Sequence, residues 1–322
     1  MKVVLVILLL TFSSTCFSQE LFPNNEPAST MPKHVLGARM FTEIYNEAGT
    51  QRNMFAARAM FGLFPKLTVM TTVTVSNHHN KLLPKDLVTH THIGNSTIYY
   101  ATNIKRGVKY PYQLNGFHAY AKFRFLSIDG QNKHFRIAAY GEWSNVNAAH
   151  DESEPNLLDD TKGFGAGLIT TWLNKHLAVS LTSGLIIPGA YNGFEQSLNA
   201  GADIPTTINY GRALKYNLSF GYLLLPRKYE DYSQVNWNIY LELAGKSYEA
   251  AKIFQYNLPI EIQSKALGAG HYIDVQPGIQ KIYNSNFRID FSVCLHLVNH
   301  SYSHFYPMYM IGVQRYFYSK RK

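Results

Sequence analysis

Histidine is the residue type in this chain with the clearest potential for chemistry. The sequence has 13 histidines, densest between positions 77 and 92, which read NHHNKLLPKDLVTHTH. Residues two apart in an extended segment point the same way, so His90 and His92 would face together. His78 and His79 could fold back toward them, and imidazole nitrogens suit Zn²⁺, Cu²⁺ and Ni²⁺. These four histidines form a candidate metal site. Solvated polar loops are the alternative, because the spacing matches no established ligand signature.

Serine and histidine residues are also available near the predicted outer rim of the fold, in the segment 300–304 and at His118 and Ser144. A hydrolase needs a nucleophile beside a base that is held by an orienting partner. No recognisable hydrolase motif surrounds either place. The sequence therefore predicts that the protein is not an enzyme and that it needs no cofactor. A lipid-modifying enzyme is the remaining catalytic alternative.

The segments that would position these residues alternate between apolar and polar side chains. In LTVMTTVTVSN, at 67–77, odd positions are mostly apolar or β-branched and even positions are mostly small and polar. Side chains in a strand point to opposite faces in turn, so this pattern predicts a strand with one apolar face. Twelve segments of the chain, this one included, have the same alternating pattern. They are at 35–45, 55–64, 67–77, 116–127, 134–145, 163–172, 177–187, 210–223, 235–245, 271–283, 287–298 and 308–318.

The lengths and connections of these segments predict a barrel in a membrane. About ten to thirteen residues per strand is close to what a tilted strand needs to cross a bilayer. The connections after the even-numbered strands are short, and those after the odd-numbered strands are mostly longer. Outer-membrane barrels combine an even strand number with short periplasmic turns and longer outer loops. The predicted fold is therefore all-β, a transmembrane antiparallel up-and-down β-barrel of about 12 strands over residues 35–318, with both termini in the periplasm.

Charged residues occupy the strand faces opposite to the apolar ones. A soluble β-sandwich could not satisfy so many charges in its core, whereas a water-filled lumen can. The seven basic and five acidic residues could tune ion preference in a pore, or pair across the lumen and plug it. The residues predicted to line the lumen are Arg39, Glu43, Arg58, Lys122, Arg124, Arg136, Glu142, Lys215, Glu242, Asp274, Arg288 and Asp290.

The N-terminal residues 1–18 have the pattern of a cleaved secretory signal peptide. Lys2 precedes a short apolar run, and small residues follow before Ser18. The mature chain then has one cysteine, Cys294, and no internal disulfide. Residues 19–34 contain three prolines and are predicted to form an irregular periplasmic leader. The net charge is +9, but the basic residues are scattered, so the expected partner is outer-membrane lipid rather than nucleic acid.

Three further segments carry a resemblance to a family of bacterial barrels. They read EPASTMPK at 26–33, DVQPGIQ at 274–280 and IGVQRYF at 311–317. Through them the chain resembles the Gram-negative outer-membrane barrels of the MetA-pathway of phenol degradation type, a family also described as transporters. The mature start Gln19-Glu20 and the abundant tyrosine and asparagine are similar to outer-membrane proteins of Bacteroidota. The resemblance implies a barrel that passes small solutes, hydrophobic ones included.

The sequence therefore leads us to expect a porin-like barrel of the cell outer membrane that acts as a passive channel or transporter for small solutes. A twelve-stranded barrel lies between eight strands, which side chains fill, and sixteen, which leave an open channel. The alternative is a non-conducting barrel that binds at its surface, with metal held by the outer loops.

Overall fold

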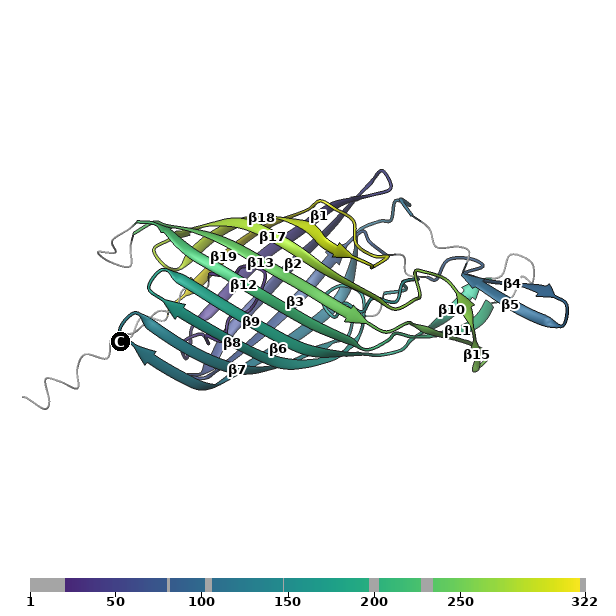
Figure 1. Cartoon of the computed structure of the whole chain (residues 1–322), viewed down its shortest axis with the longest axis horizontal. Helices are drawn as coiled ribbons and strands as arrows, with labels where there is room; N and C mark the ends of the chain where they lie inside the picture. The colour runs from purple at the N-terminus through teal and green to yellow at the C-terminus, as the bar shows by residue number, and fades with distance from the viewer. Residues whose placement is uncertain are drawn as a thin grey trace, which may run out of the picture.

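The computed structural model describes residues 21–318 apart from positions 80–81, 102–105, 147, 197–202 and 227–233, so the predicted signal peptide at 1–18 lies outside it. Twelve antiparallel strands form a closed barrel (Figure 1), which confirms the predicted all-β architecture. Among the described residues, no helix has the length and apolar character needed to cross a membrane. The barrel strands are β1 (Leu36–Glu47), β2 (Thr50–Phe64), β3 (Leu67–Ser76), β6 (Gln113–Gly130), β7 (Lys133–Ser144), β8 (Gly163–Asn174), β9 (Leu177–Pro188), β12 (Ala213–Leu225), β13 (Asn236–Tyr248), β17 (Gly270–Tyr283), β18 (Phe287–Asn299) and β19 (Met308–Phe317).

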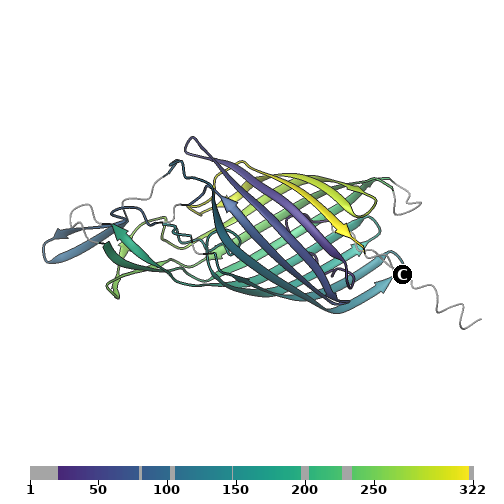
Figure 2. The same cartoon turned by 180° about the vertical axis from the view of Figure 1, so that it is seen from behind.

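The barrel closes where its first and last strands meet. β1 pairs with β19 antiparallel, from Leu36 opposite Phe317 to Ile44 opposite Tyr309. Figure 2 shows this seam, with the purple first strand beside the yellow last one. Every other barrel strand pairs with the barrel strands that precede and follow it in the chain. The topology is therefore up-and-down, and closure leaves no unpaired edge.

The second strand extends further than its sequence pattern predicted. β2 begins at Thr50 instead of at position 55, and a tight turn with positive φ at Ala48 and Gly49 joins it to β1. Four of the five added residues are polar, so their alternation cannot be recognised from apolar spacing. Glu47 and Arg52 form an ion pair at 2.5 Å across this hairpin. The pairing of polar residues explains why a strand continues where the apolar pattern has ended.

The outer wall of the barrel is apolar and the inner wall is polar. In β3, Thr68 and Thr72 are buried, whereas Val73 is 41% exposed. The same division holds around the barrel, where exposed outward side chains include Leu36, Met40, Phe55, Phe123, Leu168, Leu181, Leu185, Phe291, Ile311 and Val313. An apolar outside with a polar inside is the reverse of a soluble protein and matches a barrel that spans lipid.

Two small sheets extend beyond the barrel at one end (Figure 1). One has the order β10 (Tyr191–Gln196), β11 (Asp203–Asn209), β14 (Lys252–Gln255) and β15 (Leu258–Ile260). The other has the order β16 (Ile262–Gln263), β5 (Ser96–Ala101) and β4 (Val88–Ile93). We call this the long-loop end and the opposite end the short-turn end. A core of Leu83, Leu87, Ala149, Tyr191, Ile208, Tyr210, Ile253 and Leu267 packs beneath the loops.

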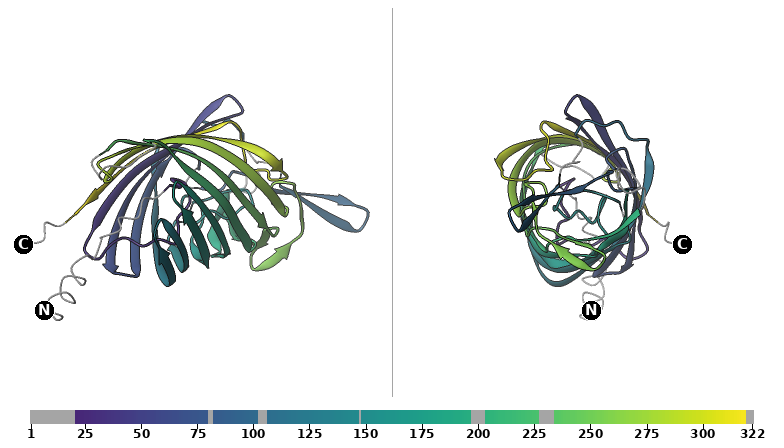
Figure 3. Two further views of the ribbon diagram at one scale, coloured as in Figure 1. Left: turned by 60° about the vertical axis from the view of Figure 1, so that its left-hand side comes forward. Right: turned by 90° about the vertical axis from the view of Figure 1, so that its right-hand side faces the viewer.

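The sequence prediction of a periplasmic leader needs correction for residues 21–34. This segment, which we call the inner segment, lies inside the barrel, and Figure 3 shows chain within the ring of strands. It begins at the short-turn end, where Leu21 packs against Leu223 and Ile282. It returns to that end before β1, where Met31 packs against Met60. Its prolines break strand structure, but its polar side chains match the polar lumen.

Candidate functional site

The inner segment is held by charged and polar groups from several sides of the lumen. The Glu26 carboxylate accepts hydrogen bonds from Arg58 Nη1 and Lys122 Nζ, both at 3.1 Å. Lys122 Nζ also donates to the Pro27 carbonyl oxygen at 2.6 Å. On the opposite side, Glu242 accepts from the Asn24 N–H at 3.2 Å and from the Asn25 amide at 2.6 Å. These contacts fix the apex of the inner segment across the middle of the barrel.

The backbone of the inner segment is satisfied by the wall as well. The Ala28 N–H donates to Thr171 Oγ1 and the Met31 N–H to Thr68 Oγ1, each at 2.8 Å. Arg136 Nη1 donates to Ser29 Oγ at 2.9 Å. Non-helical backbone is tolerated at membrane depth only where protein or water satisfies its polar groups. The side chains on the inner face of the wall therefore bind the inner segment through specific hydrogen bonds.

The remaining residues that the sequence placed in the lumen lie on its inner side or at its rim. Arg39 and Asp290 form an ion pair at 3.0 Å with both side chains buried. Arg288 is 1% exposed, with its guanidinium over the Tyr316 ring. Arg124 lies at the short-turn rim and donates to the Pro65 carbonyl oxygen. The others, Glu43, Glu142, Lys215 and Asp274, line the cavity described next.

A cavity of about 350 Å³ occupies the lumen on the long-loop side of the inner segment. Its floor includes Asn24, Asn25 and Glu26, and its walls are barrel strands. Its far side is formed by the connection between β7 and β8, including Glu154, Asp159 and Asp160. The cavity is polar, contains both signs of charge and lies between two pieces of chain that cross the lumen.

The connection between β7 and β8, which we call the outer segment (148–161), is tied to the opposite wall through Glu154. The Glu154 carboxylate accepts from Lys246 Nζ at 2.7 Å and from Ser301 Oγ at 3.0 Å, and pairs with His304 Nε2 at 3.1 Å. Burial alone would raise the pKa of Glu154, but Lys246 and His304 lower it well below its ordinary value. For His304, burial lowers the pKa, yet the Glu154 and Asp274 carboxylates raise it to about 9. At neutral pH this is a buried pair of opposite charges.

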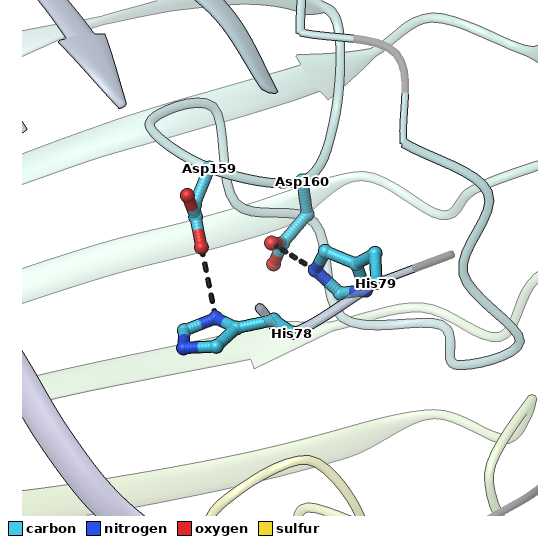
Figure 4. Close-up of side chains that lie close together, drawn as sticks. All are labelled: His78, His79, Asp159 and Asp160. Carbon is cyan, nitrogen blue, oxygen red and sulfur yellow. Dashed lines mark hydrogen bonds and ion pairs between the residues drawn. The ribbon is translucent and has the colours of Figure 1, made fainter. Parts of the chain in front are cut away.

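The four histidines of the predicted metal site do not come together. His90 and His92 lie on β4, in the small three-stranded sheet, with ring centroids 5.4 Å apart. His78 and His79 instead face Asp159 and Asp160 of the outer segment (Figure 4). The strand order explains this, because the connections after β3 and β7 leave the same rim of the barrel, separated by β6 alone. The acidic stretch after β7 was the sequence signal that could have identified these partners.

The serine and histidine groups do not form nucleophile–base pairs in the described geometry. Ser301 Oγ donates to Glu154, and His304 Nδ1 contacts the Tyr306 hydroxyl at 3.0 Å. His118 Nε2 contacts Glu142 at 2.9 Å, while Ser144 Oγ accepts from the Val146 N–H. Both histidines instead pair with carboxylates, His118 with Glu142 and His304 with Glu154.

Comparison with known proteins supports the architecture. No family model and no curated protein matches the chain. Among solved structures, the chain is similar to an outer membrane channel from Pseudomonas putida F1, with a TM-score of 0.55 and 9% identity over 92% of this chain and 100% of the other. Weaker likenesses are to the β domain of the Bordetella autotransporter BrkA (TM-score 0.38, 10% identity, 89% and 100% covered) and to the CymD monoaromatic hydrocarbon channel (TM-score 0.37, 10% identity, 90% of each). At such low identity the first likeness shows the fold, which is that of an outer-membrane β-barrel.

Proposed function

We propose that the protein is an outer-membrane channel that admits small solutes passively through its lumen. The observation that carries this proposal is the polar cavity of about 350 Å³ inside a closed barrel whose outer wall is apolar. The short turns and both ends of the barrel domain would lie on the periplasmic side, as is usual for such barrels. The motif resemblance to barrels of the MetA-pathway of phenol degradation and to Bacteroidota proteins agrees with this role.

The lining of the cavity suits small polar solutes. Ligand sites for small molecules have volumes of about 300–1,000 Å³, so this cavity is at the lower end of that range. Its charged members include Arg39, Lys215 and Glu142, which offer hydrogen bonds of both polarities. A mixed lining of this kind replaces the hydration of a polar solute without strong selection for one sign of charge.

A barrel that binds a solute without conducting it is the second candidate. It is favoured by the inner and outer segments, which both cross the lumen and are fixed by buried contacts. In a conducting barrel, solutes must pass beside the inner segment or displace it.

Liposome swelling separates the two candidates. Proteoliposomes that contain the full-length mature protein would be exposed to uncharged sugars and amino acids of increasing size. Swelling with small solutes and a cut-off with larger ones is the result expected of the channel. If correctly folded barrels cause no swelling while radiolabelled solute still binds, the channel proposal fails and the binding barrel replaces it.

A further inference from the structure

Two histidines and two aspartates meet at the outer end of the lumen. His78 Nδ1 lies 2.9 Å from Asp159 Oδ2, and His79 Nε2 lies 2.6 Å from Asp160 Oδ1. One ligand atom from each residue can be chosen so that all four lie within 4.8 Å of one another. Figure 4 shows the two imidazoles and the two carboxylates turned toward a common space.

The four side chains are shielded from bulk solvent but open to the cavity. The side chain of Asp159 is 3% exposed and that of His78 is 10% exposed. His78 Nε2 is buried and has no hydrogen-bond partner, which leaves a donor or acceptor unsatisfied at a cost. All four residues line the lumen cavity, so a small hydrated ion can reach them.

Neighbouring groups hold Asp159 and His79 in place. Asn115 Nδ2 donates to Asp159 Oδ1 at 2.5 Å, and it also donates to Ser76 Oγ. The Gln113 amide donates to the His79 carbonyl oxygen at 2.7 Å. Such outer contacts orient ligands before the ion arrives and usually strengthen its binding.

The donor set identifies the chemistry. Two imidazole nitrogens and two carboxylate oxygens suit a borderline divalent ion, and four-coordinate Zn²⁺ accepts this combination. Bonds of about 2.0–2.2 Å to such ligands place tetrahedral ligand atoms about 3.4 Å apart. The most distant ligand atoms, up to 4.8 Å apart, therefore need to close by about 1.4 Å. The two hydrogen-bonded pairs, at 2.9 and 2.6 Å, need to open by about 0.5–0.8 Å, and rotations about the side-chain bonds can supply both changes. A dication would also neutralise the two carboxylates.

We infer that His78, His79, Asp159 and Asp160 bind one divalent transition-metal ion, with Zn²⁺ preferred, and that the ion latches the outer segment to the end of β3. The histidines directly follow β3, while the aspartates belong to the outer segment that crosses the lumen. One ion would thus join the wall to the piece of chain that forms the far side of the cavity. The site goes beyond the proposed channel function and does not depend on conduction.

The test uses the purified full-length protein in detergent, with zinc binding measured by competition against a chromogenic chelator. The wild type should bind one Zn²⁺ per chain. The variants His79→Gln and Asp159→Asn should each weaken binding by about 100-fold, because each removes one of four ligands. The double variant His90→Gln/His92→Gln is the matched control and should bind like the wild type. Folding of each variant is checked by its heat-dependent migration on gels.

Two further measurements use the same samples. Co²⁺ in place of Zn²⁺ should give the intense visible bands of a tetrahedral site, and these should be lost in His79→Gln. Added Zn²⁺ should slow amide hydrogen exchange in the outer segment but not in β4. Absence of wild-type binding at millimolar zinc, or loss of binding in the His90→Gln/His92→Gln control alone, overturns the inference. Neither outcome changes the result expected in the liposome-swelling experiment, so the channel proposal and the metal-site proposal are tested independently.

Discussion

A substitution at Glu26 should weaken the binding of the inner segment to the barrel wall. The Glu26 carboxylate, which bridges Arg58 and Lys122, is 22% exposed, while the Lys122 side chain is 1% exposed. Glu26→Gln keeps the size of the side chain and one acceptor oxygen but removes the negative charge. Lys122 then remains buried beside the inner segment without its carboxylate partner.

The size of the effect follows from this geometry. Removing one member of a fully buried ion pair costs about 3–5 kcal/mol. Glu26 is 22% exposed and Pro27 still accepts from Lys122, so we expect a smaller cost of about 2 kcal/mol. This free energy corresponds to about a 30-fold increase in the population of the undocked inner segment.

Hydrogen exchange measures that population directly. The N–H groups of Ala28 and Met31 donate to Thr171 and Thr68 of the wall, so they exchange only when the inner segment leaves. In Glu26→Gln their exchange should be about 30-fold faster than in the wild type. Glu261→Gln, a change at an exposed residue of the long loops, is the control and should leave both rates unchanged. Equal rates in Glu26→Gln and the wild type would refute the ion-pair argument.

Two further predictions concern the outer segment and the wall. Since the pKa of His304 is raised from 6.5 to about 9, the stabilisation from its pairing with Glu154 is fully present below about pH 6.5 and is lost as the pH rises through 9. Conductance in bilayers should therefore rise between pH 7 and 10 as the outer segment is released. His304→Gln cannot form the ion pair with Glu154 at any pH, so its conductance should show no such rise. In the wall, a Cβ at Gly167 would overlap the Ser183 carbonyl and approach Gly184 Cα to 2.6 Å, whereas one at Gly141 would have its nearest neighbour at 4.0 Å. Gly167→Ala should lower the free energy of unfolding in urea by about 1–3 kcal/mol and Gly141→Ala by much less, and similar midpoints would contradict the packing argument.

The barrel was predictable because its strands repeat one physical requirement. Each strand must present an apolar side chain to lipid at every second position, and segments such as 67–77 and 287–298 show this clearly. The small outer sheets have no such requirement. Their strands are only two to seven residues long, too short to show a clear alternation. Their core depends on residues as distant in sequence as Leu83 and Leu267, so spacing along the chain does not reveal it.

The candidate sites were only partly predictable for a related reason. The residues on the inner faces were recognised from the strand pattern, but their partners in the inner segment were not. Glu26 is far in sequence from Lys122, and nothing local indicates that they meet. Strand order likewise determines which histidines lie near which partners. It places His78 near Asp159, whereas His90 lies on a separate hairpin. Local spacing alone predicts that all four histidines come together, because it carries no information on strand order.

Single-channel recording in planar bilayers tests the central claim most directly. Wild-type protein should give discrete conductance steps, and Asn25→Cys should give steps that shrink when a charged thiol reagent reaches the cavity floor. The wild type is the matched control for the reagent, because Cys294, the one cysteine among the described residues, is 1% exposed. Steps that the reagent reduces in Asn25→Cys alone would place the conducting path beside the inner segment. Silent bilayers from folded wild-type and Glu26→Gln barrels alike would contradict the account.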